Sequence, residues 1–341
     1  MVALPLVAEA AAAAAANSPL PLVWVLHDGK AGMASQSLGL AEATGLPFIE
    51  KRLVVAFPWS HLPPQLWWWP LRGVSVAGRP IAPPWPDMVI ACGRNAAIPA
   101  LAIRRAAAGH TLAVQIQDPR VGRGEFDLLF VPEHDRLRGA NVVVTQGALH
   151  RVTPARLAAE RRRFPQLETL PGPILSVLIG GSNRAYRLTL ACLREIGDAV
   201  ASLLRASGGA ALITPSRRTG TEGIQLLRAR LAGLPAVVWD GTGDNPYYAY
   251  LAMADAFLVT ADSVSMISEA AATGRPVHIL ALDGGDRKFA RFHEAMRRAG
   301  ITRPFAGRLE AWSYPPPDDT ERAGAVLRGL VRDRRAHRQP A

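Results

Sequence analysis

The stretch Asn245–Leu280, NPYYAYLAMADAFLVTADSVSMISEAAATGRPVHIL, decides the fold of this 341-residue chain. Its pattern predicts a helix, a short apolar strand at 256–259, a turn rich in hydroxyl side chains, a second helix and a second strand. The second helix should stop at Gly274, because glycine accommodates the left-handed residue that ends many helices. Strands that alternate with helices in this way build parallel sheets covered by helices. The stretch therefore predicts an α/β fold.

The turn between the first strand and the second helix carries a functional signal. Free backbone N–H groups and the positive end of a helix at the carboxyl edge of a parallel sheet bind phosphates. Ser263 and Ser265 add hydroxyl groups there, and the carboxylate of Glu269, one turn into the helix, could reach a ribose. The alternative is structural, with serines that cap the helix and a solvated carboxylate. The pattern of this stretch is similar to the donor site of the transferase that makes peptidoglycan lipid II, and this resemblance implies that the three residues bind a nucleotide-sugar donor.

Outward from this stretch, two series of strands and helices are separated by a proline-rich joint at 164–173. Apolar runs predict strands at 22–27, 48–55, 88–92, 112–116, 128–131 and 142–144 before the joint, and at 174–179, 211–214 and 236–239 after it. This alternation predicts two doubly wound, Rossmann-like domains that face each other across a cleft. We place a disordered extension at 1–20, an acceptor-side domain at 21–165, a donor domain at 173–315, and a C-terminal helix and tail at 316–341.

The net charge and the amino-acid composition limit the classes of partner that this chain could bind. The formal net charge is +11, but the basic residues are scattered and 36 of the 39 are arginines, so we expect no nucleic-acid groove. An anionic membrane surface or a phosphorylated substrate would suit the same charge. No apolar run is long enough for a membrane helix, and residues 1–20 lack the positive leader of a secretion signal. We expect a cytoplasmic protein, which could lie peripherally on the inner face of the cytoplasmic membrane.

Polar turns follow several predicted strands of the second domain. Gly181, Ser182, Asn183 and Arg184 follow its first strand and could hold the donor diphosphate, although a tight turn would explain them as well. The other residues that we predict to bind the donor are Ser216, Arg217, Asn245, Asp286 and Lys288. Each of them could equally cap a helix or lie in a solvated loop.

The first domain carries the predicted acceptor site. Glycosyl transfer needs a base that removes a proton from the acceptor hydroxyl, and Asp28, Glu133 and His134 are our candidates because each follows a strand. The predicted acceptor-binding residues are Gly29, Lys30, Gly32, Arg94, Asn95 and Asp118. Any of these could instead be structural. No Asp-x-Asp pair of the metal-dependent kind is present, so we expect neither a metal ion nor a cofactor besides the donor.

The segment 57–72, FPWSHLPPQLWWWPLR, contains four of the eight tryptophans of the chain. Tryptophan favours the boundary between membrane and water, so the segment predicts a peripheral membrane contact through Trp59, Trp67, Trp68 and Trp69. The alternative is a loop whose indole rings pack on the first domain.

Two resemblances extend these predictions. The pattern AYLAMAD, strand, SVSMISE and GRP is similar to the donor site of the transferase that makes peptidoglycan lipid II. The stretches DGKAGMASQSLGLAEA, VIACGRNAAIPALAIRR, FDLLFVPEHD, IGGSNRAY and ITPSRRTG, together with the opening stretch, resemble a family named for a plant protein required for mitochondrial fission. Bacterial members of that family carry a glycosyltransferase label, whereas eukaryotic members are described as adaptors that recruit a fission GTPase.

The family resemblance implies the two-domain glycosyltransferase fold called GT-B. It leaves two functions open. One is a metal-independent transferase that moves a sugar from a nucleotide diphosphate sugar to a cell-envelope lipid or lipopolysaccharide-type acceptor, lipid-linked or glycan. The other is a non-catalytic adaptor of the same fold at a membrane.

Overall fold

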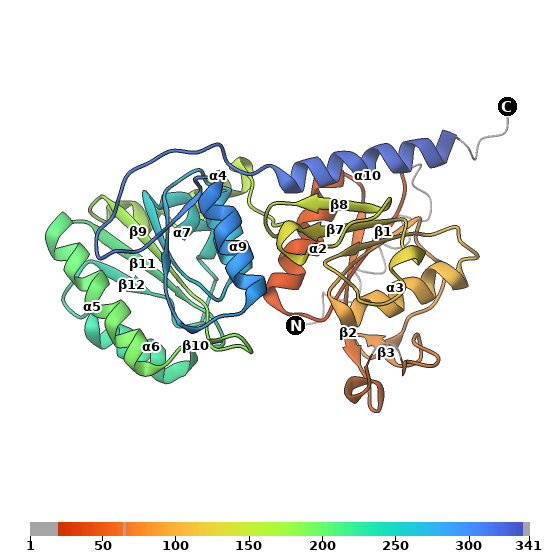
Figure 1. Ribbon diagram of the computed structural model, residues 1–341, viewed down its shortest axis with the longest axis horizontal. Helices are drawn as coiled ribbons and strands as arrows, with labels where there is room; N and C mark the ends of the chain where they lie inside the picture. The colour runs from red at the N-terminus through yellow and green to blue at the C-terminus, as the bar shows by residue number, and fades with distance from the viewer. Residues whose placement is uncertain (1–19, 64–65, 337–341) are drawn as a thin grey trace. The chain divides into compact units, whose positions relative to one another are not determined.

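The structure, a computed structural model, describes residues 20–63 and 66–336 (Figure 1). Apart from Leu20, the predicted extension at 1–20 lies outside the described residues. The chain divides into two compact units. The first is formed by Met1–Arg151 together with Asp318–Ala341, and the second by Val152–Pro317. The boundary therefore lies before the helix at 154–163, where the sequence placed it after that helix.

Within the described residues, an eight-stranded sheet forms the centre of the first unit, in the order β4-β3-β2-β1-β5-β6-β7-β8. Its strands are β1 (Val23–His27), β2 (Phe48–Val55), β3 (Val74–Val76), β4 (Arg79–Pro80), β5 (Met88–Cys92), β6 (Leu112–Ile116), β7 (Leu128–Pro132) and β8 (Val142–Thr145). The neighbouring strands β2, β1, β5, β6, β7 and β8 run parallel to one another, whereas β3 and β4 form an antiparallel edge. Because β1 and β5 are buried on both faces, β5 is apolar throughout and β1 is apolar up to its last residue, His27.

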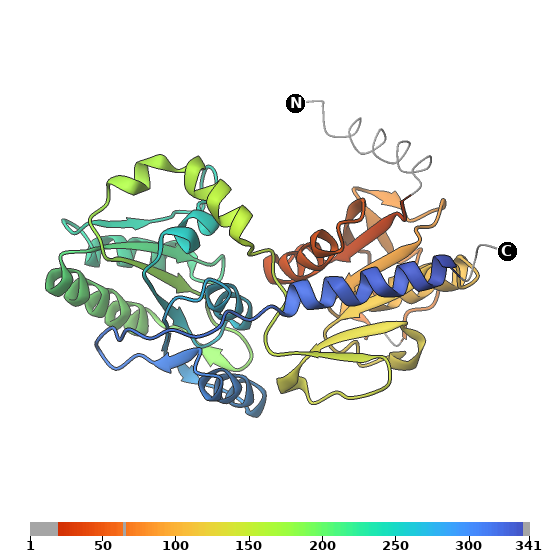
Figure 2. The same ribbon diagram turned by 90° about the horizontal axis from the view of Figure 1, so that it is seen from above.

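Helices cover the sheet of the first unit. They are α2 (Ala31–Thr44), α3 (Arg94–Ala106) and α10 (Asp319–Ala336), with 3₁₀ turns η1 (Trp59–His61), η3 (Arg123–Glu125) and η4 (Glu133–Asp135). The C-terminal helix α10 returns to this unit and packs against α2 (Figure 2). An added Cβ at Gly324 of α10 would lie 2.6 Å from the carbonyl oxygen of Ala43, so glycine permits this close approach. The Asp319 carboxylate accepts hydrogen bonds from the backbone N–H groups of Gln146 and Gly147.

A fully parallel sheet forms the centre of the second unit, in the order β12-β11-β9-β13-β14-β16 for the strands within the described residues. Its strands are β9 (Ile174–Ile179), β11 (Ala210–Pro215), β12 (Ala236–Val238), β13 (Ala256–Thr260), β14 (Val277–Leu280) and β16 (Thr302–Pro304). A separate small ladder pairs β10 (Tyr186–Arg187) with β15 (Asp283–Gly284). This ladder joins the loop after β9 to the loop after β14.

The helices of the second unit are α4 (Pro154–Arg163), α5 (Leu190–Ser207), α6 (Gly220–Arg230), α7 (Tyr247–Met253), α8 (Val264–Ala271) and α9 (Arg287–Arg298), with the 3₁₀ turn η5 (Pro165–Thr169). Helix α4 packs against α7, which explains why it belongs to this unit. The opening stretch of the sequence folds as predicted, into α7, β13, α8 and β14. Helix α8 is followed by a turn to Gly274, which takes the left-handed conformation at φ +73°.

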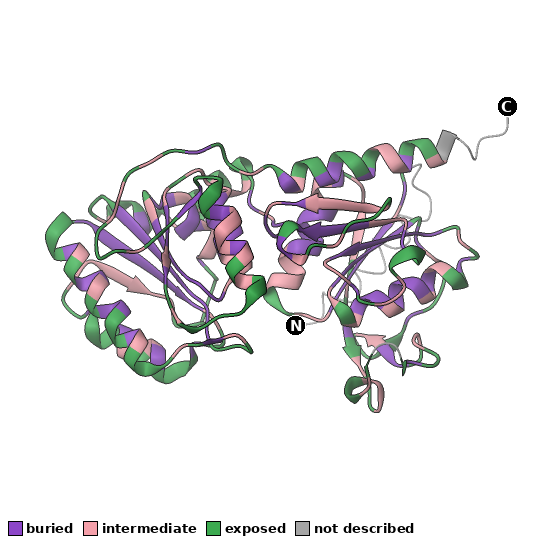
Figure 3. Cartoon of the chain, viewed as in Figure 1, coloured by how far each residue is buried: buried purple, intermediate pink, exposed green. Residues whose placement is uncertain are grey.

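Each sheet lies between two apolar layers (Figure 3). In the first unit, Val89 and Ala91 of β5 face one layer, whereas Met88 and Ile90 face the other. The predicted fold class, with one α/β Rossmann-like unit on each side of the joint, is confirmed. Among the described helices, none combines the length and the apolar character that a membrane crossing requires.

Candidate functional site

The carboxyl edge of the second sheet has a topological switch point. The chain runs from β9 to β11 on one side and later to β13 on the other side, so β9 has these two strands as neighbours. Ligands of open α/β sheets bind at such points, because the loops diverge there and leave a crevice. The loops that begin at Gly180, Ser216 and Ala261 all start from this edge.

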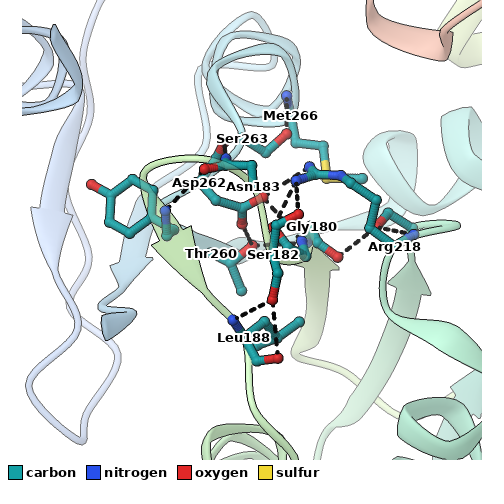
Figure 4. Close-up of polar contacts among 12 residues, drawn as sticks. Gly180, Ser182, Asn183, Leu188, Arg218, Thr260, Asp262, Ser263 and Met266 are labelled. Carbon is teal, nitrogen blue, oxygen red and sulfur yellow. Dashed lines mark hydrogen bonds and ion pairs between the residues drawn. The ribbon is translucent and has the colours of Figure 1, made fainter. Parts of the chain in front are cut away.

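Asp262 is the centre of the hydrogen-bond network at this edge (Figure 4). Its side chain has no exposed area. Its carboxylate accepts hydrogen bonds from the Gly181 N–H at 2.9 Å, from the Thr260 hydroxyl at 2.7 Å and from the Arg218 guanidinium at 2.8 Å. Because the charge is both paired and hydrogen-bonded, a carboxylate can be buried here.

The same network fixes the turn at Gly180 and Gly181. The Gly180 N–H donates to the Thr260 hydroxyl at 2.8 Å, and the Gly180 carbonyl accepts from Thr219 at 2.8 Å. Arg218 donates to the Gly181 carbonyl at 2.6 Å. An added Cβ at Gly181 would lie 2.4 Å from Cβ of Arg218, so this close packing requires glycine. Since its N–H is engaged by Asp262, Gly181 shapes the loop and does not offer a free donor to a ligand.

Ser182 and Asn183 hold the next part of the loop. The Ser182 hydroxyl accepts from the Leu188 N–H at 2.9 Å, and the Asn183 side-chain oxygen accepts from the N–H groups of Ala185 and Tyr186. These contacts orient the chain so that Arg184 stands exposed at the tip. Within the described residues, the Arg184 guanidinium has no hydrogen-bond or ion-pair partner.

The loop after β11 likewise contains both hydrogen-bonded side chains and a free one. The Ser216 hydroxyl donates to the Gly180 carbonyl, and so it links this loop to the neighbouring one. Arg218 is engaged by Asp262, whereas the adjacent Arg217 is exposed and its guanidinium has no partner in the described part of the chain. Two free guanidinium groups thus follow adjacent strands at the switch point.

The N-terminus of α8 lies at the end of β13. Ser263 is its N-cap, and the hydroxyl accepts from the Met266 N–H at 3.4 Å (Figure 4). The N–H groups of Val264 and Ser265 come before the first helical hydrogen bond and donate to no backbone or side-chain group in the described ranges. The Ser263 hydroxyl therefore caps the helix, which is the structural alternative to ligand binding. The free N–H groups of Val264 and Ser265 beside it remain available to an anion.

Glu269 is buried at 5% exposure, and its Oε2 accepts a hydrogen bond from the Tyr247 hydroxyl at 2.6 Å. Burial and the neighbouring carboxylate of Glu269 raise the pKa of Tyr247 well above its usual value. The phenol therefore stays protonated and donates to Glu269. This contact fixes the carboxylate in place, so Glu269 is not the solvated helix residue of the structural alternative.

Of the three other predicted donor-site residues, Asn245 and Asp286 have local structural roles. The Asn245 side chain accepts from the Tyr247 N–H at 3.0 Å at the start of α7. Asp286 caps α9 by accepting from the N–H groups of Lys288 and Phe289. The Lys288 side chain is exposed in the first turn of that helix. Ring contact between Tyr186 and Phe289, at 4.9 Å between centroids, keeps this turn beside the loop after β9.

The first unit has its own switch point, between β1 and β5. Asp28 follows β1, and its carboxylate pairs with the Lys30 ammonium and accepts from the Asn95 amide at 3.4 Å. Gly29 adopts φ +77°, and an added Cβ would collide with the Arg52 side chain. The Gly32 carbonyl accepts from Gln36. The structure therefore brings Asp28, Lys30 and Asn95 together.

Arg94 and Asp118 differ in how they are engaged. Arg94 is exposed at the start of α3 and has no side-chain partner within the residues that the structure describes. Asp118 accepts two hydrogen bonds from Arg123, both at 2.8 Å, and one from the Arg120 N–H. Burial alone would raise the pKa of Asp118, but the contacts with Arg123 and Arg120 lower it overall. Asp118 is therefore ionised and stabilises its loop through these contacts.

The three candidate bases do not converge. Glu133 is exposed and His134 is buried on η4, after β7, whereas Asp28 follows β1. Strands β5 and β6 lie between them. Three strand spacings of ~4.8 Å separate the two positions by about 14 Å, too far for Asp28 and Glu133 to act on one atom. Asp28 on one side and Glu133 with His134 on the other are therefore alternative positions for the base, and the His134 side chain is buried.

The tryptophan segment divides into buried and exposed rings. Trp67 is 7% exposed and packs in the core of the first unit, so its predicted membrane contact was wrong. Trp59 packs against the same core and donates its indole N–H to the Trp68 carbonyl at 2.8 Å. Trp68 and Trp69 are exposed.

Sequence reasoning missed Asp262, Arg218 and Tyr247. Asp262 lies two residues after the end of the strand and Arg218 lies beside the predicted ligand Arg217, so their positions in the sequence could have identified both. Tyr247 could have been found from the AYLAMAD helix only if its pairing with Glu269, twenty-two residues later, had been known.

Residues 31–330 match the family model described as Mitochondrial fission ELM1, and the chain belongs to this family. The Mitochondrial fission protein ELM1 of Arabidopsis thaliana is 36% identical over 285 residues, which are 75% of this chain and 66% of that protein, slightly less than two thirds. An uncharacterized protein of Rickettsia prowazekii is 24% identical over 359 residues, covering 90% of this chain and 97% of that one.

Among solved structures, the UDP-GlcNAc 2-epimerase from Methanocaldococcus jannaschii is similar with a TM-score of 0.56 and 10% identity, over 91% of this chain and 99% of that one. At this identity the likeness concerns the fold. It agrees with the two Rossmann-like units described above, and the fold is of the GT-B type.

Proposed function

We propose that this member of the Mitochondrial fission ELM1 family binds a nucleoside diphosphate sugar at the switch point of its second unit. It then transfers the sugar to an acceptor hydroxyl held by the first unit. The acceptor that we propose is a cell-envelope lipid or a lipopolysaccharide-type glycan. Under this proposal, the protein works in the cytoplasm at the inner face of the membrane.

One observation carries the proposal: unengaged anion-binding groups gather on three adjacent strands. Arg184 follows β9 and Arg217 follows β11, and both guanidinium groups lack partners in the described part of the chain. The free N–H groups of Val264 and Ser265 follow β13. Planar guanidinium groups and helix N-termini are both suited to phosphate oxygens.

The buried network beneath these groups supports the same proposal. Asp262 pairs with Arg218 and fixes the Gly180–Gly181 turn, so the loops that carry the free groups start from a rigid base. A site that is arranged before the ligand binds loses less entropy on binding. The UDP-GlcNAc 2-epimerase, which has a similar fold, is named for a nucleotide sugar, and this supports the ligand class.

The chemistry would proceed without a metal ion. The acceptor oxygen forms a bond to the anomeric carbon while the bond from that carbon to the diphosphate oxygen breaks. Arg184 and Arg217 would stabilise the negative charge that develops on the leaving diphosphate. Glu269, held by Tyr247, would accept hydrogen bonds from the ribose hydroxyls. Asp28 would take the proton of the acceptor hydroxyl.

A second candidate function is a non-catalytic adaptor that binds a partner at a membrane. The observation in its favour is the state of the candidate bases. Asp28 is paired with Lys30 and His134 is buried, and Asp118, which was predicted to bind the acceptor, is paired with Arg123. The name of the Arabidopsis relative, a mitochondrial fission protein, fits this function. An adaptor could retain the nucleotide site without transferring a sugar.

Isothermal titration of the full chain with UDP, GDP, CDP and their sugars tests the proposal. We expect one class of nucleotide to bind, and Arg217→Gln to weaken its affinity about tenfold, because it removes a charge-assisted hydrogen bond to phosphate. Arg205→Gln is the matched control, since it removes the same charge from an exposed position on α5.

If both variants lost nucleotide affinity equally, the change in overall charge would explain the loss, and the assignment of Arg217 to the site would be overturned. Binding without transfer to any lipid or glycan extract would favour the adaptor. Absence of binding by every nucleotide would contradict the proposal as a whole.

A further inference from the structure

The loop that joins β2 to β3, residues 56–73, exposes a group of large apolar side chains. We refer to its described residues, 56–63 and 66–73, as the aromatic loop. Phe57 is 79% exposed, Trp69 66%, Leu66 56% and Trp68 50%. In Figure 1, the segment projects from the sheet of the first unit next to β2 and β3. These four side chains, called the patch below, lie in one short loop, whereas single exposed apolar residues are the norm on protein surfaces.

Buried residues hold this loop from beneath. Trp67 packs into the core, and its indole N–H donates to the Leu62 carbonyl at 3.2 Å. Trp59 donates to the Trp68 carbonyl at 2.8 Å. An added Cβ at Gly73 would lie 2.6 Å from the Trp59 ring, so the indole packs directly on the backbone. The alternation of anchored and exposed rings presents Trp68 and Trp69 to solvent on a fixed support.

The charges around the loop have a single sign. No Asp or Glu occurs between Glu50 and Asp87, whereas Arg72 and Arg79 lie within this range and are both exposed. The Arg72 guanidinium lies 5.9 Å from the centroid of the Trp69 ring, so cation and indole are adjacent. Exposed indole rings beside arginine match the boundary region of a bilayer, where apolar chains meet headgroups.

We propose that the aromatic loop docks the protein on a lipid bilayer that contains anionic headgroups. Phe57, Trp68 and Trp69 enter the boundary between headgroups and acyl chains, and Arg72 and Arg79 contact anionic headgroups. A second copy of the chain fits the patch less well. A twofold contact places the same patch of each subunit against the other, so Arg72 and Arg79 would face like charges with no acidic partner in the loop. This inference does not depend on the nucleotide site.

Vesicle sedimentation of the full chain tests the proposal. The probe is a vesicle of phosphatidylglycerol and phosphatidylcholine in a molar ratio of about three to seven, compared with pure phosphatidylcholine. We expect binding to the mixed vesicles. The double variant Trp68→Ala/Trp69→Ala should weaken it about tenfold or more, because binding scales with the apolar area that enters the bilayer. Arg72→Gln should weaken it about fivefold.

Matched variants separate the loop from general surface properties. Leu190→Ala/Val326→Ala removes two exposed apolar side chains elsewhere, and Arg205→Gln removes one exposed charge elsewhere. Both should leave binding within a factor of about two. Circular dichroism confirms that each variant is folded; the Trp68 carbonyl that anchors Trp59 is retained in the alanine variant.

Each other outcome overturns the proposal. Failure of the folded wild-type chain to bind the mixed vesicles excludes bilayer docking. Equal binding by the Trp68→Ala/Trp69→Ala variant places the contact elsewhere. Concentration-dependent dimerisation that disappears in this variant, measured by sedimentation velocity, would identify a second copy as the occupant of the patch.

Discussion

The two switch points of this molecule have the same topology and different internal chemistry. In the second unit, Asp262 is fully buried and binds two side chains and one backbone N–H, so it fixes the loops around it. In the first unit, Asp28 keeps 15% exposure and binds Lys30 and Asn95, which are themselves at the surface. The arrangement in the second unit forms a rigid support for the loops, whereas the arrangement in the first unit leaves a carboxylate that a ligand can still reach.

The position of a residue in the fold therefore does not determine its role in the site. Both aspartates follow the carboxyl end of a central strand. The number of buried donors around each decides whether it supports the loops or is available to a ligand. The proposed nucleotide site lies at the second switch point and the proposed acceptor site at the first, and the predictions below test how the two units differ.

The largest expected effect comes from removing the buried carboxylate. Asp262→Ala should lower the free energy of unfolding by about 3 kcal/mol, because the buried Gly181 N–H, the Thr260 hydroxyl and Arg218 lose their partner. Asp28→Ala should change it by less than about 1 kcal/mol, since a partly exposed ion pair contributes little. Urea denaturation followed by circular dichroism measures both. Similar losses in the two variants would erase the comparison.

A smaller effect concerns Glu269 and its support. Glu269→Ala should weaken nucleotide affinity about tenfold, because it removes the acceptor of the ribose hydroxyls. Tyr247→Phe should weaken it only about threefold, since the carboxylate remains but loses the hydrogen bond that positions it. Isothermal titration measures both affinities. Asn95→Ala, at the first switch point, is the control and should not change nucleotide affinity; a loss there would place the nucleotide in the first unit.

The smallest effect is a pH dependence that differs between the units. Burial lowers the pKa of His278 and His293, both in the second unit, below their usual value of 6.5. On acidification below about pH 6.5, the unfolded chain binds protons that these folded residues do not, so stability falls. Burial raises the pKa of Asp319 in the first unit, so that group favours the folded state at low pH and loses this contribution as pH rises.

Urea midpoints between about pH 7 and pH 5 test this sign, because histidine titrates in that window and ordinary carboxylates do not. We expect the midpoint to fall as the pH is lowered, and the fall to be smaller in His278→Gln. A midpoint that stays constant or rises on acidification would contradict the assignment of these two histidines as buried neutral groups.

The fold could be predicted because its signals are local. Apolar runs such as 88–92 and 174–179, the second interrupted only by Ser176 and each followed by a glycine, mark buried parallel strands, and the structure has strands at both places. The end of the first unit could not be predicted. Helix α10 follows the whole second unit in the sequence but packs on α2 of the first unit. This packing depends on the close approach at Gly324, which no sequence pattern indicates.

The site was predicted in part. Loops that carry donor residues could be located, because carboxyl ends of strands are visible in the sequence. Which residue within a loop supports it could not be predicted. Arg217 and Arg218 are adjacent and identical in type, and only the buried position of Asp262 separates the free guanidinium from the engaged one.

Hydrogen exchange of the full chain, with and without the nucleotide that binds in titration, tests the division between the two switch points most directly. The account predicts slower exchange at residues 180–187, 216–219 and 261–269 of the second unit, and unchanged exchange at 27–32 and 93–96 of the first. Protection at the first unit's segments, with none at the second unit's, would contradict it.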